Sequence, residues 1–119
     1  MAANGKFDRA ALMDRVDQDV ELLGELFEDY LEDKDEHLEK LRAGVSASDA
    51  KTVYEGAHAL RGCVANFCAT SAFEVATQLQ NLATAGDMGA VPSTASRLEK
   101  ELDALTEALR AFVSESQGN

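Results

Sequence analysis

The chain has 119 residues, of which 45% are hydrophobic, and its formal net charge at pH 7 is -11. This length allows one compact core but is short for two ordinary domains, and the acidic balance argues against binding a nucleic-acid backbone, which attracts clustered Lys and Arg. No apolar run approaches the roughly 18 residues that cross a membrane, and the opening "MAANGKFDRA" has no apolar stretch typical of a signal peptide, so we expect a cytoplasmic protein without membrane insertion.

The pattern along the chain is helical throughout. A single proline, abundant Ala, Leu, Glu and Gln, and no long alternation of apolar and polar residues favour helices over strands. A short first helix is predicted after Asp8, in "DRAALMDR", and a long second helix from about Asp17 to Ala43. Its acidic segment "EDYLEDKDEHLEK" interleaves charged residues with Tyr30 and leucines, which is typical of the solvent-exposed face of a helix. We interpret His37 within it as a surface histidine.

The third and fourth helices are predicted from their capping residues. Ser48 can cap a third helix that continues to about Ala69. Ser71 and Glu74 make the S-x-x-E pattern of a capping box at the start of a fourth helix, and Gly86 ends that helix.

The last helix follows the clearest connector in the chain, "GDMGAVPS". Leucines and Phe112 mark its apolar stripe, and it is predicted to end near Val113. Four substantial helices joined by short links predict an all-α fold, namely an antiparallel up-down four-helix bundle with a short additional N-terminal helix. We expect a single domain over residues 1–119, with the ordered bundle over about residues 8–114.

The third helix has two unlike faces. At about 100° per residue, five apolar residues fall within about 40° of one direction and predict the side that faces the core: Val53, Ala57, Leu60, Val64 and Phe67. Four other residues lie between about 120° and 180° from that direction: His58, Gly62, Ala65 and Ala69. The predicted outward face therefore carries a histidine, a glycine and alanines in place of long polar residues.

Gly62 is unfavourable on such a face, since glycine in a helix interior is about 1 kcal/mol less favourable than alanine. A surface with no other role would carry Glu, Lys, Gln or Arg, which solvate well and form helix. Small side chains would instead let another protein approach closely and reach His58. We therefore interpret this face as a docking surface around an exposed imidazole.

His58 has the chemistry to accept a phosphoryl group, because a neutral imidazole is a good nucleophile near physiological pH. Arg61 follows one turn later and about 60° round the helix. There its cation would offset the negative charge of a phosphoryl group and hydrogen-bond its oxygens.

A partner for the second imidazole nitrogen is predicted on the fourth helix. If the two helices form an antiparallel hairpin centred on Ala69, His58 and Gln80 are equally far from the turn and lie at about the same height. Gln80 is therefore the candidate that orients the ring. Spacing alone fits a plain exposed glutamine equally well, and Gln78 is the second choice.

The run "AHALRGCVANF" resembles the signature of histidine phosphotransfer (HPt) domains, in which an A-H-x-L-K/R-G core is followed by small residues and often by Asn with an aromatic residue or leucine. The segment "FDRAALMDRVDQDVELLGELFEDYLE" looks like the family's N-terminal region, and the two downstream helices fit its bundle. The resemblance implies that His58 is the phosphoacceptor, Arg61 its cationic neighbour and Gly62 the clearance for a docking receiver domain. It also implies a polar residue that hydrogen-bonds the histidine where Gln80 falls.

The sequence departs from the family pattern at two positions. Arg61 stands where Lys is commoner, which keeps the charge and adds a planar fork of donors. Cys68 stands where the family often has Gly, which bears on the end of the third helix and on docking more than on chemistry. The partner-binding residues that we expect are Gly62, Ala65, Ala69 and Lys51.

Two other interpretations fit an exposed histidine on a helix. An autophosphorylating histidine-kinase dimerisation domain expects an acidic residue directly after the histidine, whereas Ala59 follows His58, and the chain has neither room for an ATP-binding module nor a glycine-rich phosphate loop. A non-catalytic helical interaction module with an incidental histidine is the other alternative. Gly62, the small residues near it and Arg61 together favour phosphotransfer over that reading.

The expected function is a phosphorelay step in two-component signalling. His58 would accept a phosphoryl group from the aspartate of one receiver domain and pass it to another, without ATP hydrolysis or autophosphorylation. The expected partners are response-regulator receiver domains and a hybrid histidine kinase, and the chain is expected to be a monomer. No cofactor or metal site is expected, and any magnesium would by resemblance belong to the receiver. Cys63 and Cys68 lie on different sides of the predicted helix and suit neither a mutual disulfide nor a metal site.

Overall fold

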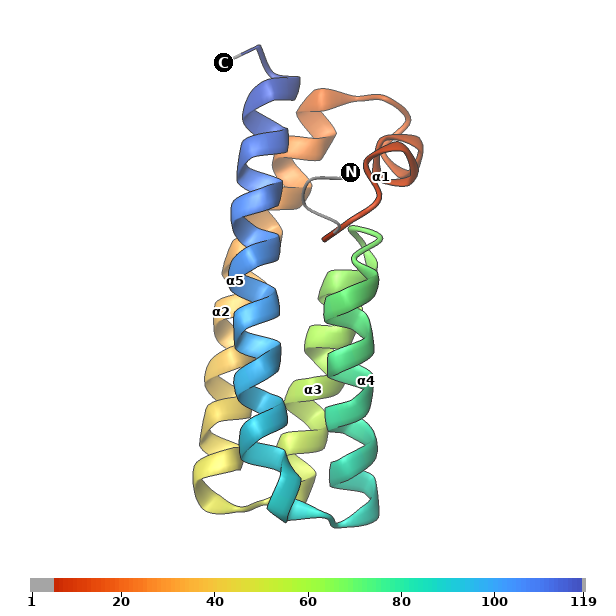
Figure 1. The fold of residues 1–119 in the computed structure, drawn as a ribbon. Coiled ribbons are helices and arrows are strands. Elements are labelled where there is room, and N and C mark those ends of the chain that lie inside the picture. The colour runs from red at the N-terminus through yellow and green to blue at the C-terminus, as the bar shows by residue number, and fades with distance from the viewer. Residues whose placement is uncertain (1–5, 119) are drawn as a thin grey trace.

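The computed structural model describes residues 6–118. This part of the chain holds five α-helices, one turn of 3-10 helix and no strand (Figure 1): α1 (Arg9–Arg15), α2 (Val20–Ala47), α3 (Ala50–Ala65), α4 (Thr70–Ala85), η1 (Met88–Ala90) and α5 (Val91–Ser116). The all-α prediction is confirmed, as is the short first helix, which Asp8 caps. Residues 1–5, on which part of the signal-peptide expectation rests, lie outside the described residues, as does Asn119.

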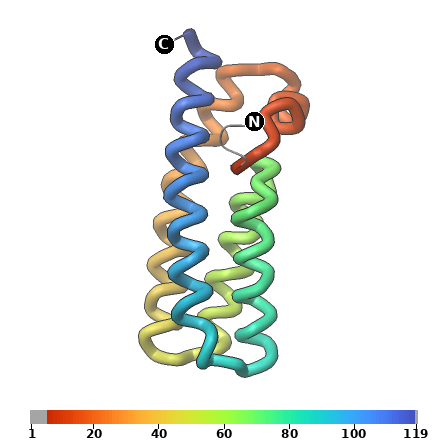
Figure 2. Tube along the Cα trace, viewed as in Figure 1, coloured from red at the N-terminus to blue at the C-terminus, as the bar shows by residue number. Residues whose placement is uncertain are grey.

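The four long helices lie side by side along one axis. Helix α3 packs against α2 and α4, and α5 closes the ring by packing against both α2 and α4. Figures 1 and 2 show successive long helices running in opposite directions, with α1 near the end where α3 passes into α4. The backbone amide of Asp8 donates a hydrogen bond to the carbonyl of Cys68 at 3.2 Å, so the segment before α1 is held against that turn.

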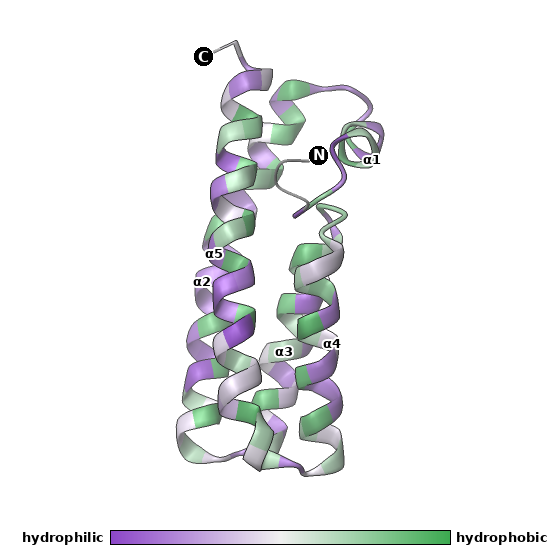
Figure 3. Cartoon of the chain, in the orientation of Figure 1, coloured by the Kyte–Doolittle hydropathy of each residue, from purple (hydrophilic) through white to green (hydrophobic). Residues whose placement is uncertain are grey.

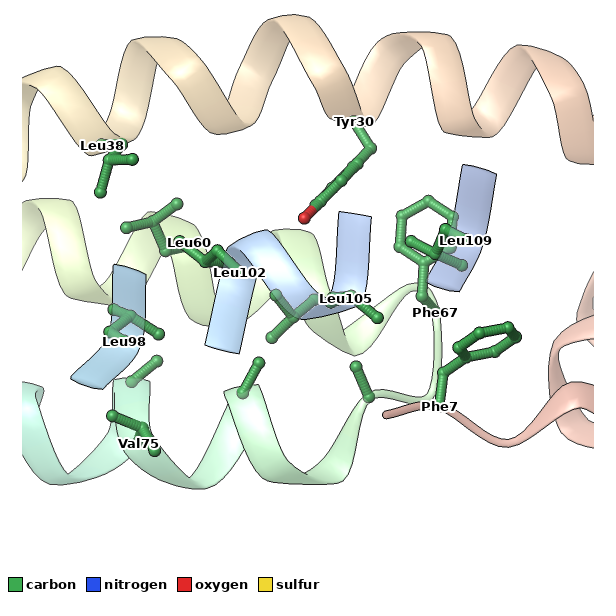
Figure 4. Packing of buried hydrophobic residues seen from close by; sticks show 14 of the residues in the cluster. Phe7, Tyr30, Leu38, Leu60, Phe67, Val75, Leu98, Leu102, Leu105 and Leu109 are labelled. Atoms are coloured by element: carbon green, nitrogen blue, oxygen red, sulfur yellow. The ribbon is translucent and has the colours of Figure 1, made fainter. Parts of the chain in front are cut away.

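The core fills the space between these helices. Apolar and polar residues alternate along every long helix (Figure 3), as expected for helices that each turn one stripe inward. Leucines from α2, α3 and α5 meet there, with Phe67 and Phe7 near the end that carries α1 (Figure 4). The position of α3 within this core decides which of its residues reach solvent.

Two glycines let α2 and α3 approach closely. A Cβ atom on Gly56 of α3 would lie 3.0 Å from the Cα of Leu41, and one on Gly44 of α2 would lie 2.8 Å from the backbone nitrogen of Val53. Larger residues would push the two backbones apart. Gly56 thus sets the distance between α3 and α2 two residues before His58.

The predicted boundaries of α2 are wrong at both ends. Asp17 has a φ angle of 54°, a left-handed conformation that interrupts a helix, and α2 begins only at Val20. The other end lies at Ala47 and not at Ala43, because the helix continues until Ser48 turns left-handed with a φ angle of 52°. Ser48 is therefore the residue that ends α2.

The predicted caps of α3 and α4 are also wrong. Asp49 caps α3 in place of Ser48, and its carboxylate accepts hydrogen bonds from two backbone amides of the first turn. Ala69 is the N-cap of α4 and provides no side-chain hydrogen bond. Because α4 begins at Thr70, Ser71 lies inside its first turn and the predicted capping box does not form.

The predicted end of α4 is confirmed, since Gly86 follows it with a φ angle of 74°. The segment after it is more helical than predicted, because "GDMGAVPS" contains η1 and the first residues of α5. Pro92 fits the first turn of α5, where a backbone amide has no partner to lose. Helix α5 continues beyond the predicted Val113 to Ser116.

A buried pair of hydroxyl groups joins α2 to α5. Tyr30 is 3% exposed. Its hydroxyl lies 2.9 Å from Oγ1 of Thr106, and Thr106 Oγ1 lies 2.7 Å from the carbonyl oxygen of Leu102. Thr106 donates to Leu102, so Tyr30 donates to Thr106. Burial raises the pKa of Tyr30 to about 12, which keeps the phenol protonated as a donor.

Removing the hydroxyl of Thr106 should therefore lower the free energy of unfolding more than removing the hydroxyl of Tyr30. Thr106→Val leaves a buried phenol without an acceptor and should lower the free energy of unfolding by about 1–3 kcal/mol. Tyr30→Phe leaves Thr106 bonded to Leu102 and should lower it by only about 0.5–1.5 kcal/mol. Urea unfolding of both variants and of the double variant measures the difference. A Tyr30→Phe effect larger than that of Thr106→Val would contradict the hydrogen-bond direction.

Candidate functional site

His58 is exposed because the opposite side of α3 is buried. The five residues predicted to face the core are between 0% and 1% exposed: Val53, Ala57, Leu60, Val64 and Phe67. Their burial fixes the rotation of the helix about its axis. His58 and Gly62 are both exposed on the side that faces solvent, as the helical spacing predicts.

The surface beside His58 is open at the next turn of the helix. A Cβ atom built on Gly62 meets nothing within 4 Å, so no packing contact explains the glycine. Ala65 is partly buried at the end of α3. Lys51 is exposed in the first turn of α3 and, seven residues before His58, lies on the same side of the helix.

Gln80 of α4 makes the hydrogen bond that the hairpin geometry suggested. Its Oε1 lies 3.3 Å from Nδ1 of His58. Since an amide oxygen only accepts, Nδ1 carries the proton and donates, and Nε2 of the neutral ring keeps its lone pair. Gln78, the second choice, instead accepts a hydrogen bond from Nη1 of Arg97 on α5 at 3.2 Å.

His58 has a second contact, which is not among those predicted from the sequence. The ring of Tyr54, one turn earlier on α3, is stacked on the imidazole with centroids 5.9 Å apart and an angle of 5° between the ring planes. The i, i+4 spacing of two aromatic residues on one helix was the signal that could have found it.

Arg61 is held by an aromatic ring of the neighbouring helix. Its Cζ lies over the ring of Phe73 on α4, 4.7 Å from the centroid, a distance at which a guanidinium is attracted to the ring face. Its Nε is buried and has no hydrogen-bond partner within residues 6–118. In the same range no hydrogen bond joins Arg61 to His58. The contact with Phe73 is not among those predicted from the sequence.

The prediction that Ala69 faces outward is wrong. Helix α3 ends at Ala65, and Cys68 has a φ angle of 56°. The angular spacing of a helix stops applying before Ala69, whose side chain is 2% exposed and belongs to the core. The same φ angle places a cysteine in the left-handed region, which favours glycine. That preference explains why glycine is common at this position in the pattern that the sequence resembles, and nothing in the structure explains the cysteine.

The turn between α3 and α4 borders a shallow hollow beside Arg61. Its volume is about 200 Å³, and it is lined by Ala65, Cys68, Ala69, Thr70 and Phe73. The hollow therefore lies at the end of α3 and the start of α4.

The cysteines near the site are free thiols. Burial raises the pKa of the Cys63 thiol to about 11, and the negative charge of Asp33 acts in the same direction. Cys63 is therefore protonated at neutral pH and is a weak nucleophile.

The part of the chain from Lys6 to Gly118 contains no group of three or more His, Cys, Asp or Glu side chains that could hold a metal ion. His37, the other histidine, is partly buried on α2. None of the helices in the described range is both long enough and apolar enough to cross a membrane.

Comparison with known proteins identifies one family. The protein-family model described as "Hpt domain" matches residues 25–112, a range that includes His58, Arg61 and Gln80. No curated protein and no solved structure matches the chain.

The open space at Gly62 leads to a prediction with a control on the same helix. Gly62→Gln should raise the free energy of unfolding by about 0.5–1 kcal/mol, because glutamine is the better helix former and no neighbour obstructs it. The same substitution should weaken binding of a receiver domain and slow phosphoryl transfer to His58, since the side chain would project into the approach path.

Gly56→Ala is the matched control, because its Cβ would lie 3.0 Å from the backbone of Leu41 and should lower stability. Urea unfolding and transfer kinetics measure both effects. A stabilised Gly62→Gln protein that accepts phosphate at the wild-type rate would show that this face is not a docking surface.

Proposed function

We propose that this chain, which belongs to the Hpt domain family, accepts a phosphoryl group from a receiver-domain aspartate on His58 and passes it to another receiver domain. Hpt domains carry out histidine phosphotransfer in phosphorelay signalling. The observation that carries the assignment to His58 is the hydrogen bond from its Nδ1 to Gln80. That bond leaves Nε2 of an exposed ring as the nucleophile, and an incidental surface histidine has no need of it.

In the proposed transfer, the lone pair of Nε2 forms a bond to phosphorus in line with the bond between phosphorus and the aspartate oxygen. The aspartate leaves as a carboxylate with the electrons of that bond. The proton on Nδ1 remains in the hydrogen bond to Gln80, so the phosphorylated ring carries a positive charge. Transfer to the second receiver reverses these steps with a different aspartate as the nucleophile.

Arg61 lies one turn from His58 on the same helix and supplies the cation that this transfer needs. Its contact with Phe73 holds the guanidinium near the site, and within residues 6–118 Arg61 forms no ion pair with a carboxylate. A phosphoryl group on His58 offers charged oxygens, and rotation of the Arg61 side chain would exchange the aromatic contact for hydrogen bonds to them.

The docking face in this proposal consists of Gly62, Ala65 and Lys51 around His58. It is supported by the open space at Gly62 and the exposure of Lys51. Lys51 places a positive charge where the acidic pocket of a receiver would approach, which favours encounter in the right orientation. Ala69 is not part of this face, because its side chain is buried.

The proposal extends to the fold, the partners and the state of the chain. We infer an antiparallel up-down four-helix bundle, supported by the packing of each long helix against two others. The partners are response-regulator receiver domains and a hybrid histidine kinase, and the chain acts as a monomeric, single-domain cytoplasmic protein. Any magnesium required for transfer is held by the receiver.

The first functional prediction concerns the acceptor. His58→Gln keeps a polar side chain of similar size but removes the nucleophilic ring, so it should abolish acid-labile labelling by a phosphorylated receiver domain and leave helix content near wild type. His37→Gln is the matched control and should be labelled like the wild type. Circular dichroism and mapping of acid-labile phosphate measure the two properties. Undiminished labelling of His58→Gln would refute the assignment.

The second functional prediction separates the charge of Arg61 from its packing. Arg61→Gln keeps an aliphatic stem against Phe73 but removes the cation, and it should slow transfer or shorten the phosphohistidine lifetime by roughly tenfold or more. Arg61→Lys retains the charge and should recover most of the activity. Stopped reactions with a labelled receiver measure both quantities. If Arg61→Gln accepts phosphate at the wild-type rate and its phosphohistidine has the wild-type lifetime, Arg61 is only a surface charge.

A further inference from the structure

Tyr54 is an exposed aromatic residue on the face that carries His58. Its side chain is 37% exposed, and within residues 6–118 only Leu22 is a comparably exposed large apolar side chain. The Tyr54 ring is nearly parallel to the imidazole of His58, with centroids 5.9 Å apart. This separation is that of an offset stack, the arrangement in which aromatic pairs attract each other.

The direction of side chains on a helix explains how the stack forms. Side chains lean towards the N-terminus of their helix, so the ring of His58 reaches back over the turn that carries Tyr54. Residues four apart are neighbours on the helix surface. The stack therefore needs no contribution from any other helix.

The contacts with Gln80 and Tyr54 restrain the imidazole in different ways. The hydrogen bond from Nδ1 to Gln80 holds one atom of the ring, at 3.3 Å. It leaves the ring able to tilt about the line between the two bonded atoms. A parallel ring against one face of the imidazole opposes this tilt. Together the two contacts define the direction in which the lone pair of Nε2 points.

We propose that Tyr54 is a positioning residue for phosphoryl transfer, whose stacked ring holds the plane of His58 so that Nε2 is aligned with the incoming phosphorus. The inference rests on the proposed function of His58. In-line attack uses a lone pair in the imidazole plane, and a nucleophile held in its reactive orientation reacts faster than one that must find it. Tyr54 does not itself form or break a bond.

The stack acts on the product of transfer as well. When Nε2 carries the phosphoryl group and Nδ1 keeps its proton, the imidazole ring is a cation. The negative face of the Tyr54 ring attracts that cation at the separation seen here. Phenylalanine would provide the same face, whereas leucine would not.

The experiment uses a phosphoryl donor too small to dock. Phosphoramidate is offered to the wild type and to Tyr54→Leu, Tyr54→Phe and Leu22→Ala, and the rate of phosphate incorporation at His58 is measured for each. Tyr54→Leu should be slower than wild type by about three- to tenfold, and Tyr54→Phe should stay within about twofold. Leu22→Ala, which removes the other exposed apolar side chain, should match the wild type.

Transfer from a phosphorylated receiver distinguishes positioning from docking. If Tyr54 positions His58, Tyr54→Leu should have a lower maximal transfer rate than the wild type. The receiver concentration at which transfer reaches half of its maximal rate should not increase. If Tyr54→Leu is normal with phosphoramidate and defective only with the receiver, Tyr54 is a docking contact and the proposal is wrong. If Tyr54→Phe is as slow as Tyr54→Leu, the hydroxyl group matters and not the stacked ring, which also refutes it.

An NMR measurement tests the stack without any phosphoryl transfer. The ring protons of His58 should show an upfield ring-current shift in the wild type and in Tyr54→Phe, and should lose it in Tyr54→Leu. Absence of that shift in the wild type would overturn the proposal even if Tyr54→Leu failed to fold. Failure of every receiver to label a wild type that phosphoramidate does label would refute the relay function alone, and leave the result for Tyr54 standing.

Discussion

The burial of one side of α3 is the constraint on which the site depends. Val53, Leu60 and Val64 have no exposed surface, and burying each such side chain stabilises the fold by roughly 1.5–3 kcal/mol. A rotation of α3 that turned His58 inward would expose all three. The same rotation would turn a larger side chain towards α2 at the position of Gly56, where the backbone of Leu41 leaves no room even for a Cβ atom. The exposure of His58 is therefore a consequence of core packing.

Helices α3 and α4 contribute different parts of the site. Helix α3 carries the imidazole and the cation of Arg61. Helix α4 provides the groups that hold them, because Gln80 bonds Nδ1 of His58 and Phe73 lies under the guanidinium of Arg61. The extensive packing between the two helices keeps these pairs together. The site is thus supported by elements that are themselves part of the core, which is the arrangement that holds a reactive group most accurately.

Two features of this face work against stability. Gly62 is a poor helix former with no packing reason to be glycine. Cys68 adopts a left-handed conformation that a non-glycine residue disfavours. Both lie where the proposed partner would approach, and unfavourable local choices of this kind concentrate at functional surfaces. Elsewhere α3 has Asp49 as its cap and a continuous apolar stripe, and its other glycine, Gly56, is explained by close packing against α2.

The sequence alone determined the helical fold, the inward stripe of α3 and the outward position of His58 and Gly62, because these depend on local periodicity. Helix ends were harder to predict. Ser48 and Asp49 are both good caps, and the choice between them depends on where the preceding helix stops. The burial of Ala69 depends on one backbone angle, that of Cys68, which no periodic pattern reveals. Only the tertiary structure could decide that Gln80 and not Gln78 meets His58, and that Arg61 rests on Phe73, because both follow from the rotation of α4 against α3.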